Sequence, residues 1–376
     1  MAYFITTPIY YVNDAPHIGH AYTTIACDIL SRYSKLKGDK TFFLTGTDEH
    51  GQKVEKAALS KKKDTQNFVD EMSQNFRDLI PFLGCQIDDF IRTTEERHKI
   101  ATQFLWNKLK DNDQIYLSNY EGWYSIRDEA FYLESELTKT ENGLIAPSGA
   151  PVEWVKEESY FFKLSQWEDK LLEYYEKNPD AILPRSRYNE VLSFIRGGLK
   201  DLSISRTTFK WGVQVPNTEN HVMYVWIDAL CNYITALNYP NTDHDSFKTF
   251  WPGIHVVGKD ILRFHAVYWP AFLMAAGLEP PKQIFAHGWW TNEGQKISKS
   301  VGNIINPYEI IDTYGLDQIR FFLFREVPFG NDGDFSKDAI AQRVNADLSN
   351  NYGNLIQRIS SFIIKNSDST VSKPHN

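Results

Sequence analysis

Apolar residues along the chain follow two different spacings. Residues 1–12 (MAYFITTPIYYV) and 41–51 (TFFLTGTDEHG) are rich in aromatic and β-branched residues and predict buried strands. Residues 21–38 and 64–84 instead place their apolar side chains on one face of a helix. Strands that alternate with helices in this way are typical of βαβ units over a parallel sheet. The pattern therefore predicts an α/β fold over residues 1–113.

The alternation fades between residues 114 and 208. Residues 115–138 and 143–164 predict hairpin-rich, partly exposed segments, and residues 165–179 and 186–198 predict two short helices after them. We therefore expect a unit inserted into the α/β fold.

Strand and helix alternation returns in residues 209–292, which predicts a second half of the same sheet. Residues 305–328 predict short helices, and the apolar spacing over residues 337–366 is strongly helical. The expected order is thus half a sheet, an insertion, the other half, and a helical end.

Composition bounds the class of protein. The 376 residues carry 42% hydrophobic and 23% charged side chains, which suits a globular protein with more than one core. The net charge of −8 argues against wholesale coating of a nucleic acid but leaves room for a local basic patch. There is no run of eighteen apolar residues and no signal-peptide pattern, so we expect a cytoplasmic protein with no membrane partner.

The three cysteines, Cys27, Cys85 and Cys231, lie far apart in the sequence and form no C-x-x-C pair. A disulfide framework and a cysteine-rich zinc site therefore both lack the necessary residues. We expect the cysteines to be small core residues.

A pair of histidines, His17 and His20, follows the first expected strand and precedes the first expected helix. Unpaired backbone N–H groups and the helix dipole attract phosphate to a helix N-terminus, where a histidine can donate hydrogen bonds to phosphate oxygens. Gly19, which has no Cβ, would let a flat base approach the backbone. Capping and packing histidines are the common alternative, so this motif alone leaves phosphate binding open.

A second motif, GQKISKSVGN, places Lys296 and Lys299 with Ser298 and Ser300 in a glycine-flanked loop after a late strand. Two lysines on a loop suit a polyphosphate, although such loops are more often solvated surface turns. Chance seldom supplies both motifs at these places in one α/β chain. Together they favour a polyphosphate ligand.

These two motifs resemble the signature motifs of the class I aminoacyl-tRNA synthetases. Six segments also resemble the bacterial methionyl-tRNA synthetase family, in that family's own order: TTPIYYVNDAPHIGHAYT, TGTDEHGQKV, YEGWYSIRDEAFY, YVWIDALCNYITAL, VVGKDILRFHAVYWPAFLMAAG and HGWWTNEGQKISKSVGN. The resemblance covers essentially the whole chain.

The resemblance implies a Rossmann-like, doubly wound parallel sheet with further parts around it. The implied division is a first catalytic half at 1–113, a connective-peptide insertion at 114–208, a second catalytic half at 209–292, the KISKS loop and a stem-contact fold at 293–345, and the start of a helical anticodon-binding domain at 346–376. By this comparison the helical domain is barely begun, so we expect a catalytic fragment that activates its amino acid and charges tRNA weakly.

The resemblance also implies a reaction. L-Methionine and ATP give methionyl-adenylate and pyrophosphate, and methionine then passes to the 3′ end of tRNA(Met). Because the methionine carboxylate is itself the nucleophile, catalysis is chiefly positioning and charge stabilisation. By similarity, His17 and His20 bind the triphosphate and stabilise charge at the α-phosphate, Lys296 and Lys299 close over the β- and γ-phosphates, and Mg²⁺ accompanies the ATP.

Two further sets of residues are implied by the resemblance. GKDILRFH is similar to the family segment that holds the ribose, which points to Gly258 and Asp260, although a strand-end turn with a capping aspartate is the alternative reading of these residues. The implied methionine pocket consists of Ile9, Tyr11, Asp48, Trp226, Ala229, Leu230, Tyr233, Ile261, Phe264 and His265.

Chemistry agrees with this pocket. Asp48 would pair with the substrate ammonium, and aromatic rings make favourable contacts with a thioether sulfur. The alternative is that Trp226, Ala229 and Tyr233, at helical spacing, are simply core. Since one methylene is worth only roughly 1 to 3 kcal/mol, homocysteine should be activated as a side reaction.

The insertion departs from part of the family. Related enzymes often hold zinc with paired cysteines, whereas this chain reads WYSIRDEAFY, with Ser125 and Asp128 and no cysteine. We therefore expect no structural zinc and a knuckle held by the packing of Trp123, Tyr124, Phe131 and Tyr132.

Three rival functions stay open at this stage. A leucine, isoleucine, valine or cysteine enzyme would share the phosphate motifs, but the insertion is too short for a separate editing domain and has no cysteine metal ligands. A non-catalytic binding module is disfavoured by the intact histidines and lysines. A small nucleotidyltransferase of the same fold would not need the Trp226 segment or the insertion.

Overall fold

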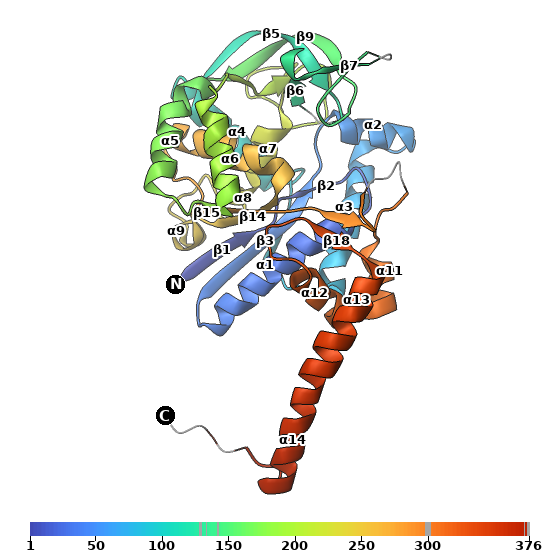
Figure 1. The fold of residues 1–376 in the computed structure, drawn as a ribbon. Helices are drawn as coiled ribbons and strands as arrows, with labels where there is room; N and C mark the ends of the chain where they lie inside the picture. The colour runs from blue at the N-terminus through green and yellow to red at the C-terminus, as the bar shows by residue number, and fades with distance from the viewer. Residues whose placement is uncertain (128–129, 133, 141–142, 298–301, 372, 374–376) are drawn as a thin grey trace. The chain divides into compact units, whose positions relative to one another are not determined.

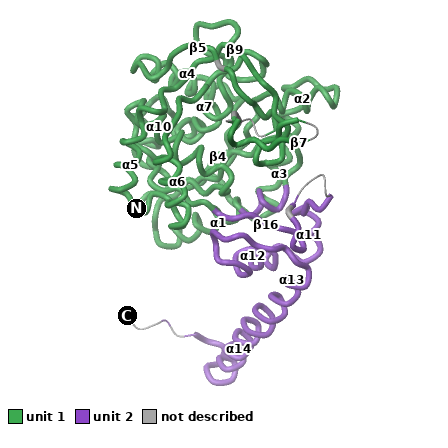
Figure 2. The backbone as a smooth tube through the Cα atoms, turned by 45° about the horizontal axis from the view of Figure 1, so that its top comes forward, with its two compact units in different colours: residues 1–16, 23–286 green, residues 17–22, 287–376 purple. Residues whose placement is uncertain are grey.

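The computed structural model describes residues 1–127, 130–132, 134–140, 143–297, 302–371 and 373. The chain divides into two compact units, one made of residues 1–16 and 23–286 and the other of residues 17–22 and 287–376 (Figure 2). The insertion, residues 114–208, lies within the first unit. The finer division expected from the sequence stays a prediction.

A parallel sheet forms the centre of the first unit (Figure 1). Its strands run in the order β10-β15-β14-β1-β3-β2, with β4 also paired to β3, and the β1–β14, β1–β3, β2–β3, β3–β4 and β10–β15 pairs are parallel. The strands are β1 (Ala2–Thr6), β2 (Tyr10–Tyr11), β3 (Lys40–Asp48), β4 (Asp89–Arg92), β10 (Ile182–Leu183), β14 (Ile254–Gly258) and β15 (Gln283–His287). Strands from both halves of the sequence share this sheet, which confirms the expected α/β fold.

The single strand expected over residues 1–12 is wrong, because the chain forms two strands there. Pro8 separates β1 from β2. Proline has no N–H to donate to a ladder, so it is excluded from a central strand. Both pieces pair with β3, and Tyr11 of β2 lies opposite Asp48.

Helices connect and cover these strands. They are α1 (Ile18–Leu36), α2 (Gln52–Ser60), α3 (Thr65–Phe82), α4 (Glu96–Asp111), α5 (Glu168–Lys177), α6 (Arg185–Arg196), α7 (Val225–Leu230), α8 (Asn232–Thr235), α9 (Asp245–Phe250) and α10 (Trp269–Ala275). The helices expected from apolar spacing at 21–38, 64–84, 165–179 and 186–198 are confirmed by α1, α3, α5 and α6. Figure 1 shows α5 and α6 side by side.

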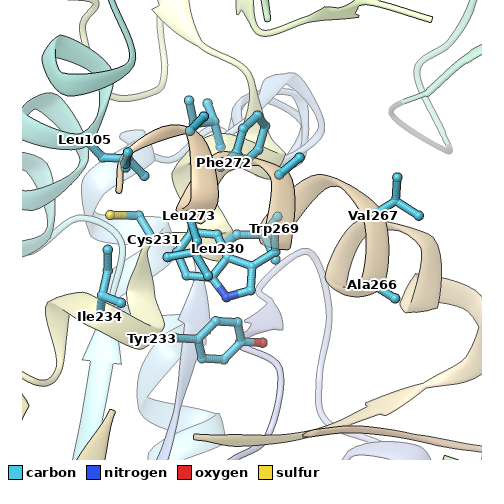
Figure 3. Packing of buried hydrophobic residues seen from close by; sticks show 14 of the residues in the cluster. Leu105, Leu230, Cys231, Tyr233, Ile234, Ala266, Val267, Trp269, Phe272 and Leu273 are labelled. Carbon is cyan, nitrogen blue, oxygen red and sulfur yellow. The ribbon is translucent and has the colours of Figure 1, made fainter. Parts of the chain in front are cut away.

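The main core of the first unit joins the two halves of the sheet to the helices. Leu105 of α4, Leu230 of α7, Ile234 of α8 and Phe272 of α10 pack together in it (Figure 3). Cys27, Cys85 and Cys231 are all buried, which confirms their expected place in the core.

The insertion is built on a long antiparallel pair, as its hairpin-rich sequence predicts. β5 (Ile115–Ser125) and β9 (Glu153–Phe162) pair from Ile115 opposite Phe162 to Tyr124 opposite Glu153. The other strands of the first unit are β6 (Ala130–Tyr132), β7 (Thr138–Thr140), β8 (Gly143–Ile145), β11 (Leu202–Ser203), β12 (Ser205–Arg206) and β13 (Val222–Met223). Short 3₁₀ turns span Glu134–Glu136 and Leu164–Trp167.

The second unit combines a small sheet with helices. β16 (Trp290–Asn292) lies between β17 (Gln295–Lys296) and β18 (Gly333–Phe335). The expected short helices are confirmed as α11 (Pro307–Tyr314) and α12 (Leu316–Arg325), and the expected helical end consists of α13 (Lys337–Arg343), a π-helical segment (Val344–Gly353) and α14 (Asn354–Asn366). Of the described residues, none belongs to a helix long and apolar enough to cross a membrane.

Candidate active site

Two of the implied pocket residues form a stacked aromatic pair in the first unit. The ring centroids of Trp226, on α7, and Phe264 lie 3.6 Å apart, and the rings are nearly parallel, with 8° between their planes. Phe264 begins a π-helical segment, Phe264–Tyr268, and such segments are frequent at functional sites. Nε1 of Trp226 is buried without a hydrogen-bond partner among the described residues.

Tyr233 and His265 form a hydrogen-bonded pair. His265 directly follows Phe264 in the sequence, and Tyr233 belongs to α8. Nδ1 of His265 is 2.9 Å from the carbonyl oxygen of Ile261, and its Nε2 is 2.7 Å from the hydroxyl of Tyr233. Because a carbonyl oxygen only accepts, Nδ1 carries the proton and Nε2 accepts from Tyr233. The ring of Tyr233 stacks on His255, at 3.9 Å between centroids, and lies near Trp269 (Figure 3).

Burial keeps this pair uncharged. It lowers the pKa of His265 to about 4, a change that the bond to Ile261 and the nearby Asp260 only partly oppose. Burial also raises the pKa of Tyr233 well above its ordinary value. Both side chains are therefore neutral at pH 7.

The remaining implied pocket residues of the first unit fall into two groups. Ile9, Trp226 and Ile261 are half-buried and pack against the main core, of which Leu230 and Tyr233 are members, and Ala229 is buried on α7. Tyr11 and Asp48 are neighbours on β2 and β3, where the N–H of Val12 donates to the carbonyl of Asp48. Tyr11 packs against a second, smaller core.

The implied ribose segment lies at the end of β14. Gly258 is the last residue of the strand, and Lys259–Ile261 forms a 3₁₀ turn that carries an exposed Asp260. Gly258 is the N-cap residue of this turn. Ribose binding by Gly258 and Asp260 and the capping alternative both stay predictions.

The histidine motif belongs to the second unit, where α1 begins at Ile18, as expected for a helix N-terminus. The N–H of His17 donates to Nδ1 of His20, and the N–H of Gly19 donates to Nδ1 of His17, both at 3.0 Å. An accepting Nδ1 places the proton of a neutral imidazole on Nε2, where it can be donated to a phosphate oxygen. Burial and the neighbouring His17 lower the pKa of His20 well below its usual value.

The structure adds a second explanation for a glycine at position 19, which the sequence did not provide. A Cβ there would lie 2.9 Å from Cε1 of His17, closer than real Cβ contacts allow. The imidazole rings of His17 and His20 are 3.9 Å apart, so a side chain at position 19 would displace this pair. Glycine at position 19 thus lets the ring of His17 keep its place.

The lysine motif lies in the same unit, but only part of it is described. The loop position expected for Lys296 is wrong, because this residue belongs to β17 and its backbone pairs with Thr291 of β16. Lys299, Ser298 and Ser300 lie outside the described residues. The N–H of Ile18 donates to the carbonyl of Ile305, so the start of α1 lies beside the chain that follows this motif.

A family model shows the family of the chain. The model for class I tRNA synthetases (M) matches residues 3–360. The chain belongs to this family. The class I tRNA synthetase fold, with its parallel sheet, thus agrees with the expectation drawn from the sequence motifs.

Named relatives are similar over nearly the whole chain. The methionine–tRNA ligase of Rickettsia conorii (strain ATCC VR-613 / Malish 7) is 63% identical over 370 residues, which are 98% of this chain and 72% of the relative. That of Rickettsia bellii (strain RML369-C) is 62% identical over the same shares. The solved structure of Mycobacterium tuberculosis methionyl-tRNA synthetase in complex with methionyl-adenylate has a TM-score of 0.96 and 51% identity, covering 100% of this chain and 74% of that one.

One cluster in this class I tRNA synthetase was missed at the level of sequence. Asp228 on α7 lies between His50, after β3, and His98, on α4. The residues are far apart in sequence, and only the TDEHG segment drew attention to the neighbourhood of His50. No spacing rule would have brought Asp228 and His98 together.

The knuckle of the insertion is described only in part. Trp123 packs edge to face on Trp154 at 5.2 Å, and β5 pairs with β6 so that Tyr124 lies opposite Phe131 and Trp123 opposite Tyr132. Asp128 lies outside the described residues. Among the described residues of the chain, no three or more His, Cys, Asp or Glu side chains are placed so that they could hold a metal ion. The absence of structural zinc stays a prediction, which elemental analysis of the purified protein tests.

Proposed function

We propose that the chain is a methionine–tRNA ligase, which activates L-methionine with ATP and transfers it to the 3′ end of tRNA(Met). The relatives that carry this name are similar over 98% of the chain, and the likeness includes a structure with methionyl-adenylate. The observation that carries the proposal is the group of aromatic and neutral side chains of Trp226, Phe264, Tyr233 and His265, which the proposal treats as the slot for the methionine side chain.

The slot has the chemistry that a thioether needs. Aromatic rings offer polarizable faces and edges to sulfur, and each such contact is worth roughly 0.3–1.5 kcal/mol. The uncharged Tyr233 and His265 provide no ion pair for a charged side chain. The slot therefore favours an uncharged, unbranched side chain.

The ammonium and the ribose would be held at the ends of strands. The Asp48 carboxylate, at the carboxyl end of β3, would accept hydrogen bonds from the methionine ammonium. Gly258 and Asp260, after β14, would accommodate the ribose, since a glycine permits close approach and a carboxylate accepts from hydroxyls. Ligands of open α/β sheets bind at the carboxyl ends of the strands.

Activation needs charge stabilisation rather than a side-chain nucleophile. The methionine carboxylate attacks the α-phosphorus, the bond to the β-phosphate oxygen breaks, and pyrophosphate leaves. In this proposal Nε2–H groups of His17 and His20 donate to the phosphate oxygens, while Lys296 and Lys299 balance the charge of the leaving pyrophosphate. Mg²⁺ would be held chiefly by the ATP phosphates, as is usual for this ion. A hydroxyl of the ribose at the 3′ end of the tRNA then attacks the carbonyl carbon and releases AMP.

Pyrophosphate exchange with a panel of amino acids tests the proposal. Methionine should support exchange of labelled pyrophosphate into ATP, and homocysteine should do so less efficiently, by a factor of about 10–200 in kcat/KM. Leucine, isoleucine, valine and cysteine should give little exchange. Exchange that is faster with any of these four, or no exchange with methionine, contradicts the proposal.

A further inference from the structure

A buried carboxylate joins two histidines in the first unit. Oδ2 of Asp228 lies 2.7 Å from Nδ1 of His50, and Oδ1 lies 2.8 Å from Nε2 of His98. The side chains of Asp228 and His98 are fully buried, and that of His50 is 5% exposed. A carboxylate only accepts, so both histidines donate to it.

The three residues come from different elements of the candidate pocket. Asp228 is two residues after Trp226 and directly before Ala229 on α7. His50 is two residues after Asp48, where β3 ends. His98 belongs to α4, which packs against α8, and Thr235 of α8 lies 3.4 Å from Nδ1 of His98. The Asp228 carboxylate therefore connects α7, which carries Trp226, to the segment that carries Asp48, through a buried hydrogen bond.

The loop around His50 is held on its other side as well. Glu49 is fully buried, and its carboxylate accepts two hydrogen bonds from the guanidinium of Arg92. The carbonyl of Glu49 accepts from Nε1 of Trp211, whose ring packs against His50. Arg92 thus holds Glu49 on one side, and the contact between His50 and Asp228 connects the Asp48 segment to α7 on the other.

The charge on Asp228 persists at neutral pH. Burial alone would raise the pKa of this carboxyl, but the two histidines outweigh burial and lower it to about 2. A charged acceptor forms shorter and stronger hydrogen bonds than a neutral one and so holds its donors more firmly.

We propose that Asp228 is a positioning residue for the amino acid: with His50 and His98 it sets the place of Asp48 relative to Trp226 and Ala229. This role rests on the proposed function. Asp228 itself does not touch the substrate, so its loss should weaken methionine binding and leave ATP binding nearly unchanged.

The test compares binding constants of Asp228→Asn with those of the wild type. The dissociation constant for methionine, from isothermal titration calorimetry without ATP, should rise at least tenfold, as should KM for methionine in pyrophosphate exchange. KM for ATP should stay within twofold. An unchanged methionine affinity, or an equal rise of both KM values, overturns the role.

Variants of His50 keep the test valid should Asp228→Asn fail to fold. The side-chain amide of asparagine can replace Nδ1 as a donor, whereas leucine cannot donate. His50→Leu should therefore weaken methionine binding about tenfold, and His50→Asn should recover most of that loss. Equal affinities of the two variants overturn the role.

Asp28→Asn is the matched control. Asp28 is also a buried carboxylate in an ion pair, with Arg32 at 2.8 Å, but on α1. Its loss should lower the melting temperature and leave both KM values within twofold of the wild type, and a tenfold rise of KM for methionine would overturn the special role of Asp228. If the wild type itself neither binds methionine nor supports exchange, the proposed function fails instead.

Discussion

The hydroxyl of Tyr233 donates a 2.7 Å hydrogen bond to Nε2 of His265, whose Nδ1–H is held by the carbonyl of Ile261. Both ring nitrogens of this buried histidine are therefore used, and its ring has one tautomer and one orientation. The pair is neutral because burial shifts the two pKa values in opposite directions. This relationship leads to the first two predictions.

Tyr233→Phe should weaken methionine binding about tenfold and lower the free energy of unfolding by roughly 1–3 kcal/mol, because it leaves Nε2 of His265 buried without its donor. Calorimetric binding and urea unfolding measure the two effects. Tyr188→Phe is the control, since the buried hydroxyl of Tyr188 donates to the backbone of Tyr175 instead. Tyr188→Phe should lower the free energy of unfolding and leave the methionine affinity unchanged. Equal methionine affinities for the two variants would contradict the role given to Tyr233.

The stability of the protein should fall in acid partly because of His265. Its pKa in the folded protein, about 4, is below the ordinary histidine value of 6.5. The fold thus favours the neutral form, so this contribution is complete above about pH 6.5 and is lost as the pH falls towards 4. The full contribution is about 3 kcal/mol.

The pH prediction is tested by comparing wild type with His265→Gln. Glutamine can accept from Tyr233 through its side-chain oxygen but does not titrate. The free energy of unfolding is measured by urea titration from pH 7 to pH 4. The decrease over this range should be about 3 kcal/mol smaller for the variant than for the wild type. Identical slopes would show that His265 is not held neutral.

Trp226→Ala should raise KM for methionine by about a hundredfold, since it removes the stacked partner of Phe264 and a large part of the apolar wall. KM for ATP should change little. Trp154→Ala, at a 55% exposed position of the insertion, is the matched control and should behave as the wild type. If both variants have the same KM for methionine, Trp226 is not part of the amino-acid site.

Lys299→Ala should slow pyrophosphate exchange strongly, with a loss of several kcal/mol of transition-state stabilisation. Methionine binding should be little changed, because this lysine is proposed to act on phosphate. The kcat/KM of exchange and the calorimetric affinity for methionine separate the two effects. A weakened methionine affinity with unchanged exchange rate would contradict this assignment.

Local sequence patterns predicted the longer helices and strands, because their formation depends on the spacing of neighbouring residues. Apolar spacing indicated strands β1 and β3 and helices α1, α3, α5 and α6, and the H-I-G-H motif indicated a helix N-terminus. The pattern failed at Pro8, where one missing N–H divides a strand, and at Lys296, where two residues pair as a short strand. Such short elements carry too few residues to show a period.

Long-range pairing was beyond these patterns. Asp228 meets His50 across 178 positions and His98 across 130, and only the folded sheet brings them together. The tautomer of His265 depends likewise on the carbonyl of Ile261, which no composition or spacing reveals. The resemblance to known synthetases supplied the residues of the pocket, whereas the hydrogen bonds among them came from the structure.

The central claim is that the slot at Trp226, Phe264, Tyr233 and His265 holds the methionine side chain. The most direct measurement is the position of selenium in a crystal of the protein, made with ordinary methionine and soaked with L-selenomethionine. The account predicts an anomalous peak beside the rings of these four residues, with the ammonium at Asp48. A bound selenium away from all four rings would contradict it.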